Sequence, residues 1–378
     1  MTMTPKQRML AAYRGERPDY VPCAPEFWYY LPARLLGLDM IEFGRVPHWQ
    51  ALQQTFKHYG TEGWGAVFSG APCPDVAYSS ETTDLPEGRL LTRQTRTTQY
   101  GTLTSAWMAD PKEPGWEVER PIKDFARDWP AYKAATLGII EEINWTGVQQ
   151  ALDAVGEDYL LEVWLPAQFF DYIAGGREGG FQQGIYDLIE HEAFFAALHE
   201  EYLDYVRRYA EAACAHTTGA ALVIGCAWSC ISLISPAMWR RWDWPVVRAM
   251  ADVAHAHGRL LHIHFHGKCL DALADLATCG ADCVCPFERP PGGDVTDLGV
   301  VRRALGDRVT VNGNVHTVET LIRGTADDVR REVADIFAQW GPDTRRLIVG
   351  TGDQVGGETP DENIYAMIEA CRELGKTG

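Results

Sequence analysis

A regular alternation of short apolar runs with amphipathic segments constrains the fold of this chain more than any other feature. Eight apolar runs have the length and residue types of buried strands, and most precede a stretch with helical spacing of apolar residues. The runs occupy residues 20–28, 63–70, 159–166, 219–228, 259–267, 281–288, 308–315 and 345–353. An open doubly wound sheet alternates in the same way, but no glycine-rich fingerprint follows an early strand here.

We therefore predict an α/β fold, a (β/α)₈ TIM-type barrel, with two additions. Apolar spacing predicts an N-terminal helical extension at about Pro5 to Arg14. A segment at about 76–120 is rich in Thr, Arg and aromatic residues around a glycine turn, which predicts a β-hairpin insertion. Residues 1–378 then form one barrel domain, in which chemistry is expected at the carboxyl ends of the strands.

Composition excludes several classes of function. The net charge of −18 argues against a nucleic-acid groove or an anionic membrane surface as the main partner. Apolar runs are too short for a membrane span, and the polar N-terminus does not resemble a signal peptide, so we expect a cytoplasmic protein. The ten cysteines are then reduced thiols. The C-x-C of Cys283 and Cys285 lacks the spacing of a structural zinc site and is interpreted as core.

Three histidines alternate along one apolar run, Leu261 to Lys268, with the sequence LHIHFHGK. In a strand, alternate side chains point to one face, so His262, His264 and His266 would share a face. His264 and His266 lie nearest the carboxyl end, where a barrel carries its chemistry. His262 lies further back and is expected to be a buried supporting residue.

Other polar residues follow neighbouring strands. Glu288 precedes a Pro-Pro-Gly-Gly loop, and Asp353 lies in a glycine-rich turn before the last helix. Imidazole and carboxylate ligands suit zinc, iron, manganese or cobalt. We predict a metal site of His264, His266, Glu288 and Asp353, with catalytic roles for Glu288, His266 and Asn314. A metal-free site, in which the same groups serve as acid, base and substrate anchor, remains an alternative.

The remaining strand ends supply candidates for substrate binding. These residues are Glu26, Trp28, Trp164, Gln168 and Trp228. The aromatic clusters EFWYYLP and VWLPAQFFDY have two interpretations, core packing or an apolar pocket for an aromatic or methylated substrate.

Several longer stretches carry a family resemblance. The segments TPKQRMLAAYRGERPDYVPCAPEFW, ISPAMWRRWDWPVVRAMADVAHAHG, HFHGK, ADCVCPFERPPGGD and TPDENIYAMIEACRE together resemble the uroporphyrinogen decarboxylase superfamily. The resemblance implies a distorted (β/α)₈ barrel with a funnel at the carboxyl strand ends. In true uroporphyrinogen decarboxylases, it implies an arginine-rich N-terminal segment and an aspartate after the second strand. This chain has only Arg34 in PEFWYYLPARLLG and no acid in WGAVFSGAPCP, so haem biosynthesis is not expected.

The chain is more similar to the corrinoid-linked methyltransferase branch, which binds zinc through a His-x-Cys-Gly motif and a later cysteine. HFHG matches the first motif, with His264 at the histidine position and His266 in place of cysteine. GTGDQV matches the second, with Asp353 in place of cysteine, and Glu288 falls where the family can supply a carboxylate. The resemblance thus implies zinc or another divalent transition metal in a harder ligand set, which favours oxygen or nitrogen leaving groups.

We accordingly predict a metal-dependent methyltransferase that demethylates an O- or N-methylated small molecule. The methyl group would pass to a corrinoid protein or to tetrahydrofolate. No corrinoid-binding D-x-H-x-x-G signature occurs, so a corrinoid would arrive on a separate subunit; a homodimer is a further candidate assembly. The alternatives are a decarboxylase or lyase of a small carboxylic acid, anchored by Arg34, Arg289 or Lys268, and a corrinoid- or tetrapyrrole-binding protein without catalysis.

Overall fold

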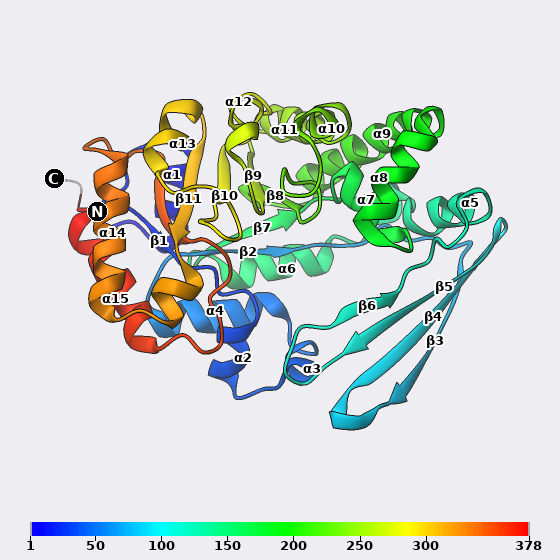
Figure 1. The fold of residues 1–378 in the computed structure, drawn as a ribbon, viewed down its shortest axis with the longest axis horizontal. Helices are drawn as coiled ribbons and strands as arrows, with labels where there is room; N and C mark the ends of the chain where they lie inside the picture. Colours follow the sequence, from blue (N-terminus) through cyan, green and yellow to red (C-terminus); the bar gives the residue numbers. More distant parts are fainter. Residues whose placement is uncertain (1, 377–378) are drawn as a thin grey trace.

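One parallel sheet organises most of the chain in the computed structural model, which describes residues 2–376 (Figure 1). Its strands are β1 (Cys23–Ala24), β2 (Trp64–Val67), β7 (Leu160–Trp164), β8 (Ala221–Cys226), β9 (Leu260–Phe265), β10 (Cys283–Pro286), β11 (Thr310–Val315) and β12 (Leu347–Thr351). They are hydrogen-bonded in the order β1-β12-β11-β10-β9-β8-β7-β2, all parallel. The curled α/β sheet confirms the predicted TIM-type fold.

Side chains connect the two ends of this strand order. Cys23 in β1 donates its backbone N–H to Oε2 of Glu62 at 3.1 Å, and its carbonyl accepts from the Thr61 hydroxyl at 2.6 Å. Glu62 is also paired with Arg8 of the first helix, with Nη1 and Oε1 2.7 Å apart. The seam between β1 and β2 is therefore held by a buried polar network that involves the N-terminal helix.

The helices surround this sheet. They are α1 (Pro5–Arg14), α2 (Tyr30–Leu36), α3 (Met40–Phe43), α4 (His48–Tyr59), α5 (Phe125–Thr136), α6 (Thr146–Val155), α7 (Phe169–Gly176), α8 (Gly180–Glu190), α9 (Glu192–His216), α10 (Pro236–Trp242), α11 (Trp244–Ala256), α12 (Leu273–Leu276), α13 (Leu298–Leu305), α14 (Ala326–Trp340) and α15 (Asp361–Leu374). Short turns are η1 (Pro86–Gly88), η2 (Ile140–Glu142), η3 (Leu270–Ala272) and η4 (Thr317–Ile322).

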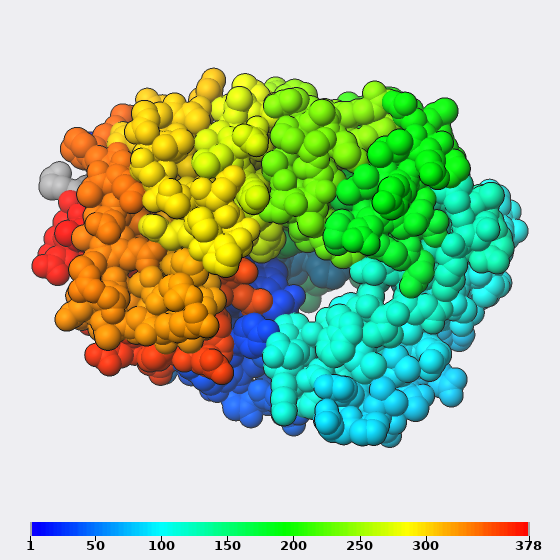
Figure 2. Space-filling model, viewed as in Figure 1, coloured from blue at the N-terminus to red at the C-terminus, as the bar shows by residue number. Residues whose placement is uncertain are grey.

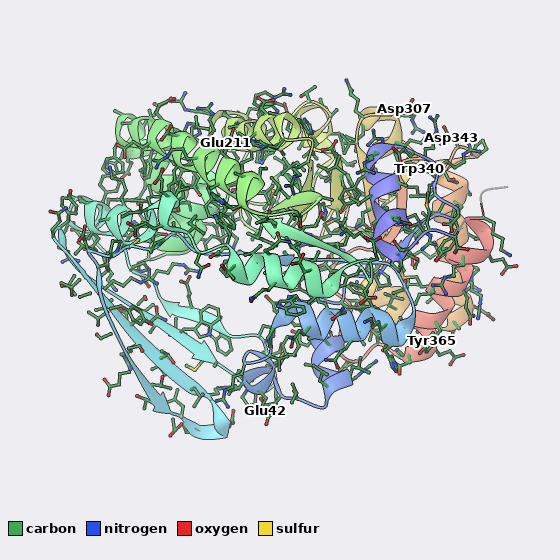
Figure 3. The ribbon with its side chains drawn as sticks, turned by 180° about the vertical axis from the view of Figure 1, so that it is seen from behind. Glu42, Glu211, Asp307, Trp340, Asp343 and Tyr365 are labelled. Carbon is green, nitrogen blue, oxygen red and sulfur yellow. The ribbon has the colours of Figure 1, made fainter. Side chains whose placement is uncertain are left out.

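Local sequence signals explain where several helices begin and end. Thr4 and Gln7 form a capping box at the start of α1, and Gly15 ends that helix with a φ of 71°. From behind, α1 lies near the labelled Trp340 at the end of α14 (Figure 3). The region 236–256, which looks like one helix in the sequence, is divided at Asp243 into α10 and α11. Pro245 explains the division, because proline has no N–H to continue the preceding helix.

The predicted insertion is a four-stranded antiparallel sheet rather than a single hairpin. Its strands, in spatial as well as chain order, are β3 (Ala77–Asp84), β4 (Leu90–Thr98), β5 (Gly101–Ala109) and β6 (Trp116–Glu119). All eight residues of β3 are exposed, so its sequence lacks the apolar alternation that marks a half-buried strand. The sheet stands beside the barrel and packs against α5 through β5 (Figure 1).

The interior of the molecule is apolar and its cysteines are unpaired. All ten cysteines are free thiols, and only Cys73 is not buried. Within residues 2–376, no helix is both long and apolar enough to cross a membrane.

Candidate metal centre and active site

Strand β9 carries two of the three alternating histidines into the barrel. Parallel pairing places His264 level with Gly225 of β8 and with Cys285 of β10. The strand ends at Phe265, so His266 lies one residue beyond it. The His264 and His266 rings nevertheless remain neighbours, with centroids 4.2 Å apart.

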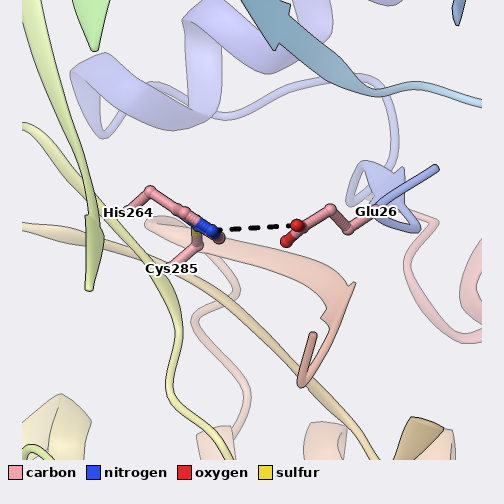
Figure 4. Close-up of side chains that lie close together, drawn as sticks. All are labelled: Glu26, His264 and Cys285. Atoms are coloured by element: carbon pink, nitrogen blue, oxygen red, sulfur yellow. Dashed lines mark hydrogen bonds and ion pairs between the residues drawn. The ribbon is translucent and has the colours of Figure 1, made fainter. Parts of the chain in front are cut away.

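Two side chains from other parts of the sheet, Glu26 and Cys285, approach His264. Glu26, just after β1, places Oε1 3.8 Å from Nε2 of His264 (Figure 4). Cys285 of β10 places Sγ 3.0 Å from Nδ1 of the same ring. One donor atom from each of the three residues lies within 4.8 Å of the other two, and all three residues are buried. The cluster thus combines an oxygen, a nitrogen and a sulfur donor.

A second, deeper layer supports this cluster. His262 is fully buried, with Nδ1 2.9 Å from Oε2 of Glu162 and Nε2 3.0 Å from Sγ of Cys285. The carboxylate therefore fixes the orientation of the imidazole, which in turn contacts the thiol. This arrangement agrees with the expectation that His262 is a buried supporting residue.

His266 pairs with Glu288 at the outer side of the cluster. Their Nδ1 and Oε1 atoms are 3.0 Å apart, and the same oxygen accepts the backbone N–H of Gly267 at 2.7 Å. Burial alone lowers the pKa of His266, but the hydrogen bond to Glu288 and the charges of Glu26, Asp353 and Glu288 outweigh it and raise this pKa to about 9.

The acids and the inner histidine of this region are shifted toward their neutral forms. Burial, aided by the charges of Asp353 and Glu288, raises the pKa of Glu26 to about 8. Burial also raises the pKa of Asp353. Burial and then the charges of His266 and His262 lower the pKa of His264 well below its usual value. A neutral imidazole is the form of histidine that binds a metal.

A cavity of about 390 Å³ opens onto this region. It is lined by six of the residues predicted for the site, namely Glu26, Trp28, Trp164, His264, His266 and Asp353. The donor cluster therefore faces a space in which a small molecule can reach it.

Besides Glu288, which pairs with His266, three predicted residues do not line this cavity. Gln168 is fully buried, and its side-chain amide contacts Sγ of Cys226. Trp228 lies under the guanidinium of Arg120, with 4.8 Å between the guanidinium carbon and the ring centroid. Asn314 donates to the carbonyl of Phe287 at 2.9 Å and so holds the loop after β10. Their residue types suited a site, but their side chains are used for packing and loop structure.

Two residues near the site were not predicted from the sequence. Cys285 was interpreted as core, although its C-x-C pattern on β10 repeats the H-x-H pattern on β9, and parallel register places His264 beside it. Asp171, in the first turn of α7, lines the cavity and accepts the backbone N–H groups of Trp228 and Ser229 at 2.8 and 3.1 Å. The sequence offered no signal for Asp171 beyond its acidic type.

The donor cluster differs from the predicted ligand set, and its donor types suit a zinc ion. The predicted set combined His264 with His266, Glu288 and Asp353, whereas the tightest group combines His264 with Glu26 and Cys285. Ligand atoms around tetrahedral zinc lie roughly 3.3–3.6 Å apart, since the metal–ligand distances are about 2.0–2.3 Å. The 3.8 Å separation between Glu26 and His264 is close to that range. A zinc ion held by these three residues would have a position left for substrate.

Comparisons with known proteins place these features in context. The family model described as uroporphyrinogen decarboxylase (URO-D) matches residues 165–374, more than half of the chain. A uroporphyrinogen decarboxylase of Saccharophagus degradans is 33% identical over 109 residues, which are 29% of this chain and 27% of that protein. The methylcobamide:CoM methyltransferase MtaA of Methanosarcina barkeri is 29% identical over 111 residues, covering 29% of this chain and 30% of that protein.

The whole fold also occurs in a solved structure. A methyltransferase from Methanosarcina mazei aligns with a TM-score of 0.66 at 17% identity, covering 98% of this chain and 99% of that chain. The sequence matches, by contrast, span less than a third of the length of the two relatives named above. The likeness to the solved structure concerns the fold.

Proposed function

Because the chain belongs to the uroporphyrinogen decarboxylase (URO-D) family, we propose that it is a metal-dependent methyltransferase within that family. Its substrate is an O- or N-methylated small molecule, and the acceptor is a corrinoid protein or tetrahydrofolate. The observation that carries the proposal is the cluster of Glu26, His264 and Cys285 near the carboxyl ends of the strands, of which Glu26 and His264 also line the smaller cavity. The methyltransferases among the relatives support the same class of reaction.

The charges around the cavity favour methyl transfer over decarboxylation. A cation commonly holds the substrate carboxylate of a decarboxylase, and in this lining that group is His266, which the scheme below uses as a proton donor. Arg34 instead bonds the carbonyls of Gly357 and Thr359, each at 2.8 Å, and Arg289 pairs with Glu332 at 2.8 Å. Neither arginine lines the cavity, nor does Lys268, whereas three carboxyl groups (Glu26, Asp171 and Asp353) do.

The reaction needs stabilisation of the leaving group and a proton that the leaving group can take up. The bond between the methyl carbon and its oxygen or nitrogen breaks, and both electrons stay on the heteroatom, which takes up a proton. The methyl carbon accepts an electron pair from the acceptor, either Co(I) of a corrinoid or a nitrogen of tetrahydrofolate. A divalent metal ion bound at the site would supply Lewis acidity toward the departing heteroatom.

The residues of this chain have separate tasks in that scheme. Glu26, His264 and Cys285 would hold the metal ion, and His262 orients Cys285 from below. His266 is assigned the proton that the departing heteroatom receives, since its ring lines the cavity and Glu288 holds its Nδ1. The single thiol leaves the ligand set harder than one with two thiolates, which favours oxygen and nitrogen leaving groups.

A spectroscopic assay tests the proposal. Zinc-loaded protein is mixed with cob(I)alamin, or in parallel with tetrahydrofolate, and with methoxybenzene, methoxyacetate or N,N-dimethylglycine as donor. We expect methylation of an acceptor from at least one donor and a loss of at least about 100-fold in His264→Ala. His255→Ala, a change at a half-exposed histidine on α11, should keep the activity.

Two results would contradict the proposal. One is methylation by His264→Ala at the wild-type rate, which would show that the donor cluster takes no part in the reaction. The other is the absence of methylation with all three donors together with release of CO2 from a carboxylic acid without any acceptor. That outcome would favour the decarboxylase alternative.

A further inference from the structure

A second, larger cavity adjoins the candidate active site. It has a volume of about 1000 Å³ and lies where the inserted sheet faces the barrel. The two cavities share Trp28, Tyr29, Trp164 and Ala167 in their linings. The ring centroids of Trp28 and Trp164 are 6.1 Å apart, so these two indoles stand where one cavity meets the other. The space-filling view shows a hollow between the cyan insertion, the blue N-terminal segment and the green helices (Figure 2).

Aromatic side chains from distant parts of the chain line this larger cavity. They are Trp28 and Tyr29 after β1, Phe43 of α3, Phe68 after β2, Trp107 of β5, Trp164 of β7, and Tyr205 and Tyr209 of α9. Phe68 is 71% exposed and Trp107 is 42% exposed, although large apolar side chains are usually covered. Exposed rings around a cavity indicate a ligand that presents an apolar surface.

Two polar side chains of this lining have partners within the protein. The Asp110 carboxylate accepts from Nε of Arg89 at 2.6 Å and from the backbone N–H of Lys112 at 2.7 Å. His48 has Nε2 2.6 Å from the carbonyl of Trp28, and burial lowers its pKa. Arg45 also lines the cavity and is exposed. The walls thus offer many ring faces together with this exposed guanidinium.

The inserted sheet contributes to this cavity with one face. Trp107 and Ala109 alternate on β5 and both line the cavity. A Cβ on Gly115 would be 2.4 Å from Nε1 of Trp107, so the glycine allows the indole to lie against the backbone there. Trp116 of β6 pairs with Met108, not with Trp107, and therefore belongs to the opposite face.

We propose that this aromatic cavity binds the body of the substrate, a neutral planar ring, while the methylated heteroatom of that ring reaches the donor cluster through the adjoining smaller cavity. The inference rests on the proposed function and names its substrate class, an aromatic methyl ether or N-methylated ring. Ring faces at 4.5–7 Å between centroids attract another aromatic ring beyond the burial of its area. A narrow or strongly hydrophilic donor would leave these ring faces without a partner.

Direct binding of 2-methoxynaphthalene, followed by the polarisation of its own fluorescence, tests the inference without any turnover. The wild-type protein should bind the probe, and Trp107→Ala should weaken binding roughly 3- to 10-fold, the loss expected for one aromatic contact. Trp116→Ala is the matched control, because its indole is 41% exposed on the other face of the same sheet, and it should bind as wild type does.

A second pair of variants keeps the test informative if Trp107→Ala fails to fold. Phe68→Ala removes an exposed ring of the lining and should also weaken binding, whereas Tyr100→Ala removes a ring that is 56% exposed but outside the cavity. Failure of the wild type to bind the probe, or equal binding by Phe68→Ala and Tyr100→Ala, would overturn the inference.

The inference and the proposed function fail in different ways. If methoxyacetate methylates the acceptor but 2-methoxynaphthalene does not bind, the methyltransferase stands and the aromatic substrate class is wrong. If the probe binds with the predicted effects of Trp107→Ala but no donor methylates an acceptor, the aromatic site stands and the proposed function is wrong.

Discussion

Replacing Cys285 by alanine should weaken zinc binding by two to three orders of magnitude. A structural zinc site binds its ion with about 10–16 kcal/mol, shared among its ligands. One of three or four ligands then contributes on the order of 3–4 kcal/mol, which corresponds to a factor of about 10²–10³ in the dissociation constant. Cys285 is the sulfur donor of the cluster, and its loss leaves Glu26 and His264 as a two-residue site.

Cys283→Ala provides a matched control for this change. Cys283 lies two residues earlier on β10, so it shares the inward face of the strand, and it is equally buried. Both variants delete one sulfur atom from the interior, and their metal-free forms should unfold at similar temperatures. Cys283 is not in the donor cluster, so its removal should change zinc affinity less than threefold.

Competition with a chromophoric chelator measures the three dissociation constants. The expected result is tight binding by the wild type and by Cys283→Ala, with the large loss confined to Cys285→Ala. Zinc affinity in Cys285→Ala within threefold of the wild type would refute the assignment of this thiol as a ligand. An equal loss of zinc affinity in Cys283→Ala would show that altered packing of the strand causes the loss.

Two further predictions concern stability. Arg8→Ala should lower the free energy of unfolding in urea titrations by about 3–5 kcal/mol, because it leaves the buried Glu62 carboxylate without its cation. Arg17→Ala removes one partner of an exposed pair 3.9 Å apart and should change this free energy by less than about 0.5 kcal/mol. Similar losses in the two variants would contradict the role of the seam network. Burial, followed by the charge of Asp171, raises the pKa of Asp243 from 3.8 to about 8, so folding favours the protonated form of this carboxyl group. The wild type should therefore lose stability relative to Asp243→Asn as the pH rises from about 4 to about 8. A constant difference in stability between the two proteins over that range would contradict the raised pKa.

The alternation of strands and helices was sufficient to predict the barrel because each element buries a recognisable apolar face. Strand β9 was located to within one residue at its amino end and two residues at its carboxyl end, so His266 lies beyond the strand although its ring stays beside that of His264. The inserted sheet was recognised only as a hairpin, since β3 is exposed along its whole length and leaves no alternating pattern.

The composition of the site was harder to predict, because it depends on which strands become neighbours and in what register. His264 was identified from its own strand, but its closest partners come from β10 and from the segment after β1. Polar residue type and position at a predicted strand end placed Asn314 and Gln168 in the site, whereas the structure uses the first to hold a loop and buries the second beside Cys226. Glu26 was assigned to substrate and lies instead among the donor atoms.

X-ray absorption at the zinc edge, measured on the zinc-loaded protein, tests the central claim most directly. The cluster of Glu26, His264 and Cys285 predicts one sulfur scatterer at about 2.3 Å and two or three oxygen or nitrogen scatterers at about 2.0–2.1 Å. Addition of a bound methyl donor should change the oxygen and nitrogen shell and leave the sulfur in place. A first shell without sulfur would contradict the assignment of Cys285 as a ligand and would indicate a ligand set of nitrogen and oxygen alone.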